Sequence, residues 1–578
     1  MKSKFFALNA GGVFFFGVFL STLVASDAKA QSAPSLVTSP IPHIMPPTVP
    51  NFGKKSGAVK KNYEISPIPA VSIKIHSVAI LGGSIFPQSK LESIVSGLSG
   101  KSVMLSKLAA DRLALVELYR RHGYIFTTVM LNIDAAGNAQ FVITEGYISS
   151  IKLSKDIGPA GTMVMEILQH LVNSGPLNEA ALEHWVLLAQ RVPGVSVQAI
   201  LQADPGSPGG MVLVADVSKQ TFSGLIMADN RASTESGTTE GLLVVDINSL
   251  TSHGDQTEVS FYHTEGGTYN FGQISESFYL GASGLKLDLY GGAGRSSPYG
   301  VLGWVGYKSW VQVFGGRLSY PVILRRDRSL DIRLGVDAEQ SRIMTANTLK
   351  NTSSVRVVRV GGQYAWQDIW LGDSHNAVSI VDFELSQGLP CLGSSSDGRT
   401  APPGERDDAK FDFWKINASI NRDQVLFPLG ASANVALYTA VGGQYSTDIL
   451  PSAEEFYLGG ARYTRGYYSG QVVGDKAIYT TTELQLNTGT DFSVFQHKFN
   501  LGAQFYGFYD WGEEWSNMPM DLNHRIASVG GGVELGLTHN FELDGEITHR
   551  LVTQLDPGST NIAPLSDTTI YWGITGHY

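Results

Sequence analysis

Short segments in which apolar and polar residues alternate fill the chain from residue 222 to its end. Alternation with a period of two puts every second side chain on the same face of a β-strand. Long helical patterns are rare in this region. Sixteen alternating segments follow one another: 222–229, 242–248, 258–263, 271–280, 286–292, 304–320, 330–337, 354–366, 377–385, 411–421, 433–445, 479–485, 501–510, 527–537, 541–550 and 570–578.

The spacing of these segments suits strands that cross a membrane. Each strand with its connection takes roughly 22 residues, and a tilted transmembrane strand needs about 9–11 of them. Short turns alternate with longer polar loops such as 387–410, which is typical of an outer-membrane barrel. We therefore expect a transmembrane β-barrel of about 16 antiparallel strands over 220–578. The alternative is a secreted all-β domain such as a propeller or a sandwich.

Aromatic residues support the barrel. Eight of the nine tryptophans follow Lys219, as girdles at the two membrane interfaces require. In the last segment Trp572, Ile574 and the terminal Tyr578 share one face. A final strand of this kind is how outer-membrane barrels present themselves to the barrel assembly machinery, so we expect these three residues to form the assembly signal.

A different pattern precedes the barrel. Residues 71–147 and 148–219 each read as a strand, two amphipathic helices and two further strands. In the first unit one strand spans 71–81, and Ile73, Ile75, Val78 and Ile80 are expected in the core. This recurrence predicts two small α+β domains in tandem, each with helices on one face of a sheet.

The N-terminus indicates export. Lys2 and Lys4 precede an apolar run and a small-residue cleavage site at 28–30, so residues 1–30 read as a signal peptide. A retained anchor helix is the alternative. Residues 31–70 hold eight prolines, which predicts an extended linker, with any helix that plugs a pore short or absent.

Composition excludes several functions. The formal net charge of −10 and a pI of about 5.7 give no general attraction for nucleic acid. The single cysteine, Cys391, rules out an internal disulfide framework and multi-thiolate metal sites. We find no spacing typical of metal ligands, no nucleophile motif and no phosphate-binding loop, so neither a metal, a cofactor nor an enzymatic activity is expected.

One loop of the predicted barrel is unusual in its chemistry. Residues 456–467 (FYLGGARYTRGY) carry two arginines, four aromatic residues and three glycines between two strand patterns. Asp510 lies within a later strand pattern, 508–512 (FYDWG). We hypothesise that Arg465 reaches into the pore and pairs with Asp510 on its wall, because a guanidinium matches a carboxylate in geometry. The alternative is a solvated loop arginine.

These motifs resemble known families. The tandem units resemble POTRA (polypeptide-transport-associated) domains, most closely at residues 118–124 (LYRRHGY), 144–148 (TEGYI) and 188–197. The whole chain from about residue 71 resembles the TpsB transporters of two-partner secretion, also called hemolysin secretion/activation proteins, within the Omp85 superfamily. Thr464 stands where the family usually has valine, and Tyr578 where it usually has phenylalanine.

The resemblance implies roles for individual residues. An inward hairpin at about 450–478 would hold the pore lock, formed by Arg465, Gly466, Tyr467 and Asp510. The residues that support the hairpin would be Phe456, Gly459, Gly460, Phe508 and Gly512. The implied location is the bacterial outer membrane, with the POTRA units in the periplasm.

The implied function is export of a large partner exoprotein through the barrel, without ATP. The partner would be a secreted TpsA-like protein, extended in the periplasm and bound by the POTRA units. Other expected partners are the barrel assembly machinery and outer-membrane lipids. Two alternatives remain: an Omp85-type factor that assembles or inserts outer-membrane proteins, and a passive diffusion porin.

Overall fold

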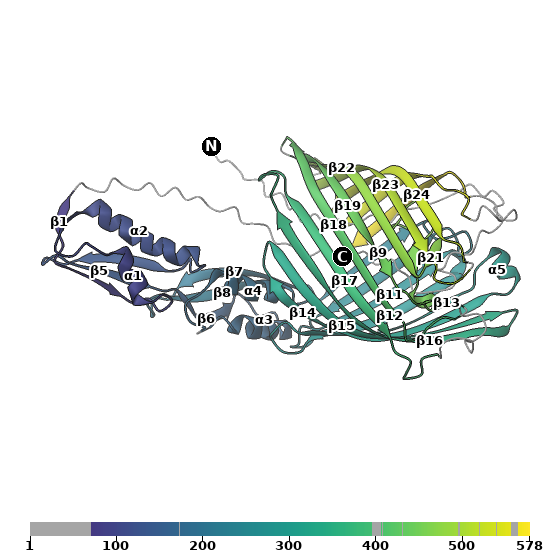
Figure 1. Cartoon of the computed structure of the whole chain (residues 1–578), viewed down its shortest axis with the longest axis horizontal. Helices are drawn as coiled ribbons and strands as arrows, with labels where there is room; N and C mark the ends of the chain where they lie inside the picture. The colour runs from purple at the N-terminus through teal and green to yellow at the C-terminus, as the bar shows by residue number, and fades with distance from the viewer. Residues whose placement is uncertain are drawn as a thin grey trace.

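The computed structural model describes residues 71–578 except 173, 396–405, 407, 431, 495–496, 520, 539 and 556–564. The expectations for the signal peptide, the linker and the plug fall on residues 1–70 and lie outside the described residues. Two small α+β units extend from one end of a large β-barrel (Figure 1). None of the described helices is long and apolar enough to cross a membrane.

The first unit contains two separate small sheets. Strands β2, β5 and β4 form a sheet in the order β2-β5-β4, with β2 parallel to β5. Strands β1 and β3 form the other sheet. The elements are β1 (Ser72–Lys74), β2 (Ser77–Leu81), α1 (Gln88–Ile94), β3 (Ser102–Met104), α2 (Leu105–Arg121), β4 (Thr128–Ile133) and β5 (Asn138–Thr144).

The expectation of one continuous strand over 71–81 is wrong. The chain changes partners at Ile75, whose N–H donates to the carbonyl oxygen of Lys101 beside β3, at 2.8 Å. The N–H of the next residue, His76, donates to Gly137 beside β5. Ile75 itself is fully buried, so the break lets one apolar side chain enter the core where the two sheets meet.

The second unit has the expected order of elements. They are β6 (Tyr147–Leu153), α3 (Pro159–Gln169), α4 (Glu179–Gln190), β7 (Val195–Ala203) and β8 (Gly210–Lys219). The sheet order is β6-β8-β7. Helix α4 begins after Asn178, whose side chain accepts a hydrogen bond from the N–H of Ala180 at 2.9 Å and so satisfies one free donor of the first turn.

The second unit is packed directly onto the barrel. Tyr279 and Leu324, next to barrel turns, belong to the same buried apolar cluster as Leu188 of α4. Arg191 donates to both carboxylate oxygens of Asp331 at 2.6 and 3.1 Å. The core of this unit therefore includes side chains of the barrel turns beneath it.

The barrel is closed and antiparallel, and its sixteen strands confirm the predicted number and class. Each barrel strand pairs with the barrel strands before and after it in the chain, and the last pairs with the first. Strands β20 and β21, between β19 and β22, are not part of the barrel. The strands are β9 (Phe222–Asp229), β10 (Glu240–Asn248), β11 (Gln256–Thr264), β12 (Tyr269–Tyr279), β13 (Lys286–Ser296), β14 (Lys308–Leu324), β15 (Arg328–Thr345), β16 (Thr348–Asp368), β17 (Ala377–Gly388), β18 (Trp414–Leu429), β19 (Ala433–Tyr445), β22 (Lys476–Val494), β23 (His497–Trp515), β24 (His524–Thr538), β25 (Phe541–Arg550) and β26 (Thr568–His577).

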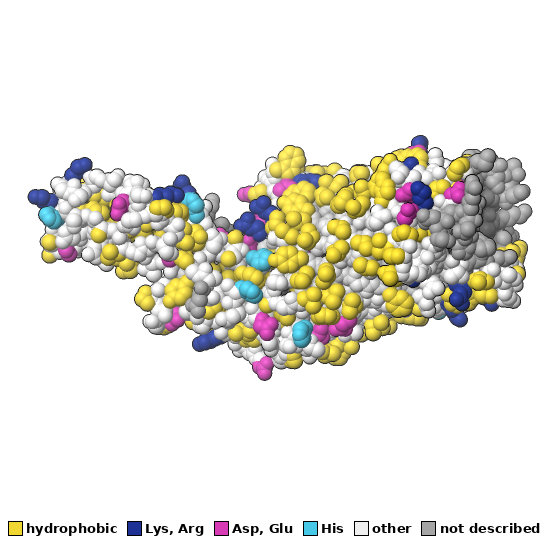
Figure 2. All heavy atoms as spheres, turned by 60° about the horizontal axis from the view of Figure 1, so that its bottom comes forward, with side chains coloured by type: hydrophobic (Ala, Val, Ile, Leu, Met, Phe, Trp, Pro, Cys, Tyr) yellow, Lys and Arg dark blue, Asp and Glu magenta, His cyan; other side chains and the backbone are white. Residues whose placement is uncertain are grey.

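Alternation along these strands separates two surfaces. On β12, for example, Phe271 is buried inside the barrel whereas Ile274 is exposed outside. The outward apolar side chains cover much of the barrel wall in Figure 2. An outer wall of this kind suits a lipid environment, because exposing so large an apolar surface to water is unfavourable.

Several predicted strand boundaries are wrong; the pattern over 411–421, for example, starts three residues before β18. The pattern started a strand at Trp304, but Gly300–Trp304 forms the short helix α5 and the strand β14 begins at Lys308. Several strands are also longer than membrane crossing requires, up to the 21 residues of β16. The connection that contains α5 lies at the end of the barrel away from the α+β units (Figure 1).

Candidate functional site: a hairpin inside the barrel

The connection between β19 and β22 folds back into the barrel as a hairpin, which we define as residues 446–475. Its two arms pair as the short strands β20 (Phe456–Leu458) and β21 (Val472–Gly474). The turn at its inner part needs glycine. Gly459 has φ of 105°, and a Cβ there would lie 2.1 Å from the carbonyl oxygen of Tyr468.

Arg465 is at the tip of the hairpin and its side chain is only 5% exposed. Its Nε and Nη2 donate to the two carboxylate oxygens of Asp510 at 2.9 and 3.0 Å. Its backbone N–H also donates to Asp510 at 3.0 Å, and Nη1 donates to Glu483. One arginine thus faces two buried carboxylates on the adjacent strands β22 and β23.

Aromatic residues surround this ion pair. The guanidinium carbon of Arg465 lies 3.6 Å from the ring centroid of Phe508, a cation–π contact in a site closed to water. The hydroxyl oxygen of Tyr467 lies 2.8 Å from the carbonyl oxygens of both Ala527 and Val552, donates its one hydrogen to one of them, and accepts from the N–H groups of the same two residues. The tip is therefore bound both to the barrel strands and to the segment after β25.

Two glycines allow this close approach. A Cβ on Gly466 would lie 2.8 Å from the Cβ of Ser528 on the wall. A Cβ on Gly512 would lie 3.2 Å from a methyl group of Leu458 on the hairpin. Both positions leave room only for a hydrogen atom or a shifted neighbour, because real carbon contacts are longer. Gly460, with φ of 80°, continues the turn begun at Gly459.

The outer part of the hairpin packs through aromatic rings. Phe456 is buried and stacks near Tyr479 of β22, with ring centroids 6.0 Å apart. Tyr463 fills the space beside both rings, with centroids 5.0 and 4.6 Å away. These contacts attach the first arm of the hairpin to the wall between its base and its tip.

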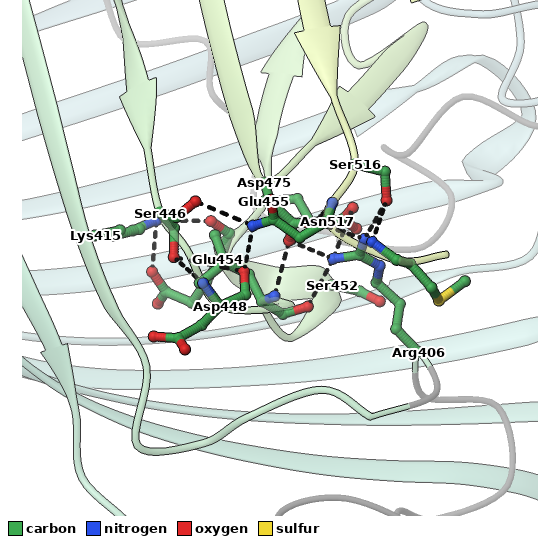
Figure 3. Close-up of polar contacts among 12 residues, drawn as sticks. Arg406, Lys415, Ser446, Asp448, Ser452, Glu454, Glu455, Asp475, Ser516 and Asn517 are labelled. Carbon is green, nitrogen blue, oxygen red and sulfur yellow. Dashed lines mark hydrogen bonds and ion pairs between the residues drawn. The ribbon is translucent and has the colours of Figure 1, made fainter. Parts of the chain in front are cut away.

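The base of the hairpin holds a second set of buried charges. Glu454 accepts from Nη2 of Arg359 on β16 at 2.7 Å and pairs with Nζ of Lys415 on β18 at 2.7 Å. Lys415 also donates to the backbone oxygen of Glu454 at 2.8 Å (Figure 3). Both side chains of this acid–lysine pair are less than a tenth exposed.

Asp475 anchors the return arm of the base. Its carboxylate accepts from both terminal nitrogens of Arg406 at 2.6 and 3.0 Å, from the N–H of Leu450 at 2.8 Å and from the N–H of Asn517 at 2.7 Å. Figure 3 shows Arg406 and Asn517 reaching this carboxylate from separate loops. The carboxylate is fully buried and fully satisfied.

These contacts place the hairpin across the interior. Its base is bound to β16 and β18, whereas its tip is bound to β22, β23 and the segment after β25. In the closed strand order β16 is eighth and β25 fifteenth from β9, nearly opposite one another. A segment fixed at both walls narrows the passage that a barrel of this size otherwise leaves open.

Sequence reasoning found the tip but missed the base. Asp475 lies within the hairpin expected at about 450–478, but it was not singled out there. Glu454, Arg359 and Lys415 gave none, because their partners lie far apart in sequence. Arg462, the other arginine of the loop, is exposed.

The three residues of the expected assembly signal lie along the closing strand. Trp572 and Ile574 point outward and are partly exposed. Tyr578 exchanges two backbone hydrogen bonds with Gly224 of β9, each 3.2 Å long. Its ring fills the space above Gly224, where any Cβ would lie 2.4 Å from the ring.

Comparisons with known proteins identify the family of the chain. The family model described as haemolysin secretion/activation protein ShlB/FhaC/HecB matches residues 209–535, and the ShlB-type POTRA domain matches residues 73–146. No curated protein matches the sequence.

Two solved structures share the fold. The chain is similar to CdiB from Escherichia coli, with a TM-score of 0.69 at 17% identity over 93% of each chain. It is also similar to CdiB from Acinetobacter baumannii, with a TM-score of 0.59 at 16% identity over 92% of this chain and 94% of that one. The barrel lies in the outer membrane and the POTRA region in the periplasm. The chain belongs to the haemolysin secretion/activation protein family and is a TpsB-type transporter of the Omp85 superfamily.

Proposed function

We propose that this transporter exports a large partner exoprotein through its barrel, and that the hairpin gates the passage. The observation that carries the proposal is the ion pair of Arg465 with Asp510 and Glu483, buried at the tip of a segment that crosses the interior. Breaking a buried pair by removing one partner costs about 3–5 kcal/mol, whereas an exposed pair contributes about 0–1 kcal/mol. Removing either partner of this buried pair is therefore expected to destabilise the seated hairpin far more than removing an exposed charge would.

The periplasmic units are proposed to recognise the exoprotein. Strands β4 and β7 each end their sheet, so within the described part of the chain one side of each has no strand partner. Met130 on β4 and Ile200 on β7 are exposed apolar side chains on these edge strands. An extended chain can add to such an edge through backbone hydrogen bonds, while exposed apolar side chains select its sequence.

Transport is proposed to proceed without ATP, since the periplasm contains none. Folding of the exoprotein outside the cell would remove extended chain from the exit and make return unfavourable. The barrel would then need to supply only a passage and a reversible gate. This requirement fits a hairpin held by ion pairs and aromatic packing rather than by covalent bonds.

Export in a reconstituted pairing tests the proposal. The transporter is produced in a host without other two-partner systems, together with a candidate exoprotein encoded beside its gene, and exoprotein in the medium is measured. We expect export that Arg465→Ala and Asp510→Ala strongly reduce at equal barrel abundance. Normal export by both variants would refute the gating role. Defective assembly of unrelated outer-membrane barrels, with no exoprotein in the medium, would favour an assembly factor instead.

A further inference from the structure

The junction between the last and first strands is the shortest in the barrel. Its register joins five residue pairs, from Gly573–Asp229 to His577–Leu225, and the two hydrogen bonds between Tyr578 and Gly224 extend it by one pair. Every other neighbouring pair of barrel strands joins at least eight. We call this junction the seam. Strand β26 continues beyond it for five more residues, Thr568 to Trp572, which pair only with β25.

Two residues that follow β9 lie beside the part of β26 that does not pair with β9. The side-chain oxygen of Asn230 accepts a hydrogen bond from the N–H of Trp572 at 3.3 Å. The guanidinium of Arg231 lies 4.1 Å from the ring centroid of Tyr571. The backbone N–H of Arg231 donates to Asp229 at 2.9 Å, which fixes the turn out of β9. Side chains thus connect the two strands where the ladder has ended.

Arg231 also reaches two elements beyond the seam. Its Nη2 donates to Glu546 of β25 at 3.0 Å, and its Nη1 donates to the backbone oxygen of Arg465 at 3.1 Å. Both charged side chains of the Arg231–Glu546 pair are nearly inaccessible, at 5% and 0% exposed. Arg231 therefore joins the first strand, the last two strands and the tip of the hairpin at one point.

A second arginine also binds the backbone of the hairpin tip. Arg550 of β25 donates to the backbone oxygen of Gly466, next to Arg465 in sequence. Two arginines from the two sides of the seam thus hold consecutive carbonyl groups of the tip. Every residue type supplies a backbone carbonyl, so these two contacts depend on the position of the tip rather than on its side chains.

We propose that Arg231 is a positioning residue that links the hairpin tip to the seam, so that seating of the hairpin and closure of the seam support each other. The inference rests on the proposed gating role of the hairpin. It adds that the tip stabilises the weakest junction of the wall. Displacing the tip would remove one partner of Arg231 and expose the short ladder to opening.

Hydrogen–deuterium exchange of the full-length protein in lipid nanodiscs tests this link. In Arg231→Ala, we expect amides of residues 224–229 and 573–578 to exchange about tenfold faster or more than in the wild type. Amides of β16, on the opposite wall, should be unchanged. Single-channel recordings should show more frequent openings, because the tip has lost one attachment.

The control is Arg422→Ala, which breaks a less buried ion pair of the barrel wall. Arg422 of β18 makes a two-pronged pair with Asp368 at 2.8 and 3.0 Å, away from the hairpin and the seam. Exchange at the seam should be unaffected in this variant. Seam exchange in Arg231→Ala that equals the control would overturn the proposal.

Two further variants separate the possible failures. If Arg231→Ala does not assemble, Arg231→Lys keeps the charge but cannot reach Glu546 and the tip together. Faster seam exchange in Arg231→Lys supports the link, and wild-type exchange refutes it. Normal export by both Arg465→Ala and Asp510→Ala would refute only the gating role, because the exchange result for Arg231 does not depend on any exoprotein.

Discussion

Replacing Arg465 by alanine should release the hairpin from the barrel wall. The substitution removes three side-chain hydrogen bonds and the contact with Phe508, and it leaves Asp510 and Glu483 buried without their cation. Loss of one partner from a buried pair costs about 3–5 kcal/mol. At 1.36 kcal/mol for each factor of ten, the equilibrium between seated and released hairpin should shift by about 100- to 5,000-fold.

Planar-bilayer recording of the purified protein measures this shift. We expect the wild-type channel to be mostly closed and Arg465→Ala to be open for a much larger fraction of the time. Asp510→Asn should produce a smaller change, because the amide oxygen still accepts a hydrogen bond from the arginine. Limited proteolysis of the hairpin provides a second readout, since a released tip becomes accessible to protease.

Arg462→Ala is the control on the same hairpin. Arg462 is exposed and its guanidinium lies 5.2 Å from the ring of Tyr463, so its loss should alter gating by less than a factor of about five. If Arg465→Ala and Arg462→Ala gave the same open fraction and the same proteolysis rate, buried charge would not be what holds the hairpin.

Three further predictions concern the base, the tip and the periplasmic unit. Asp475→Asn should weaken the base by about 3 kcal/mol and speed proteolysis of the hairpin; an unchanged rate would contradict the role of this carboxylate. Gly466→Ala should raise the open fraction because its Cβ meets Ser528, and Ser528→Gly in the same chain should restore closure; failure of this rescue would point to another cause. Tyr279→Ala should weaken the packing of the second unit on the barrel by about 3–5 kcal/mol, and Arg191→Ala by about 1 kcal/mol. The measurement is the width of the distance distribution between spin labels on the second unit and on the barrel. Equal broadening in the two variants would refute the larger contribution of Tyr279.

The barrel could be predicted because its signal is local. A strand with one face toward lipid and one toward the interior alternates apolar and polar side chains over a few consecutive residues, and this holds for all sixteen strands. The expectation of one strand over 71–81 failed because a break in the pattern was passed over. The apolar positions Ile73 and Ile75 are out of phase with Val78 and Ile80, and the change of partner from Lys101 to Gly137 falls between these two pairs.

The candidate site was predictable only in part. Arg465 and Asp510 stand in recognisable motifs, although they are separated by 45 residues. The pair of Arg359 with Glu454 spans 95 residues and that of Arg231 with Glu546 spans 315. No local pattern encodes such pairs, because each depends on how the closed barrel brings distant strands to one side of its interior.

The shared core of the second unit and the barrel has a consequence for folding order. Arg191 lies 88 residues before Tyr279 and 140 before Asp331, the residues that contact it. Domains of a growing chain generally fold from the N-terminus, but this unit would expose apolar surface around Leu188 until the barrel turns arrive. The last packing step of this unit therefore coincides with formation of the barrel. Until then its exposed apolar surface is a binding site for a periplasmic chaperone.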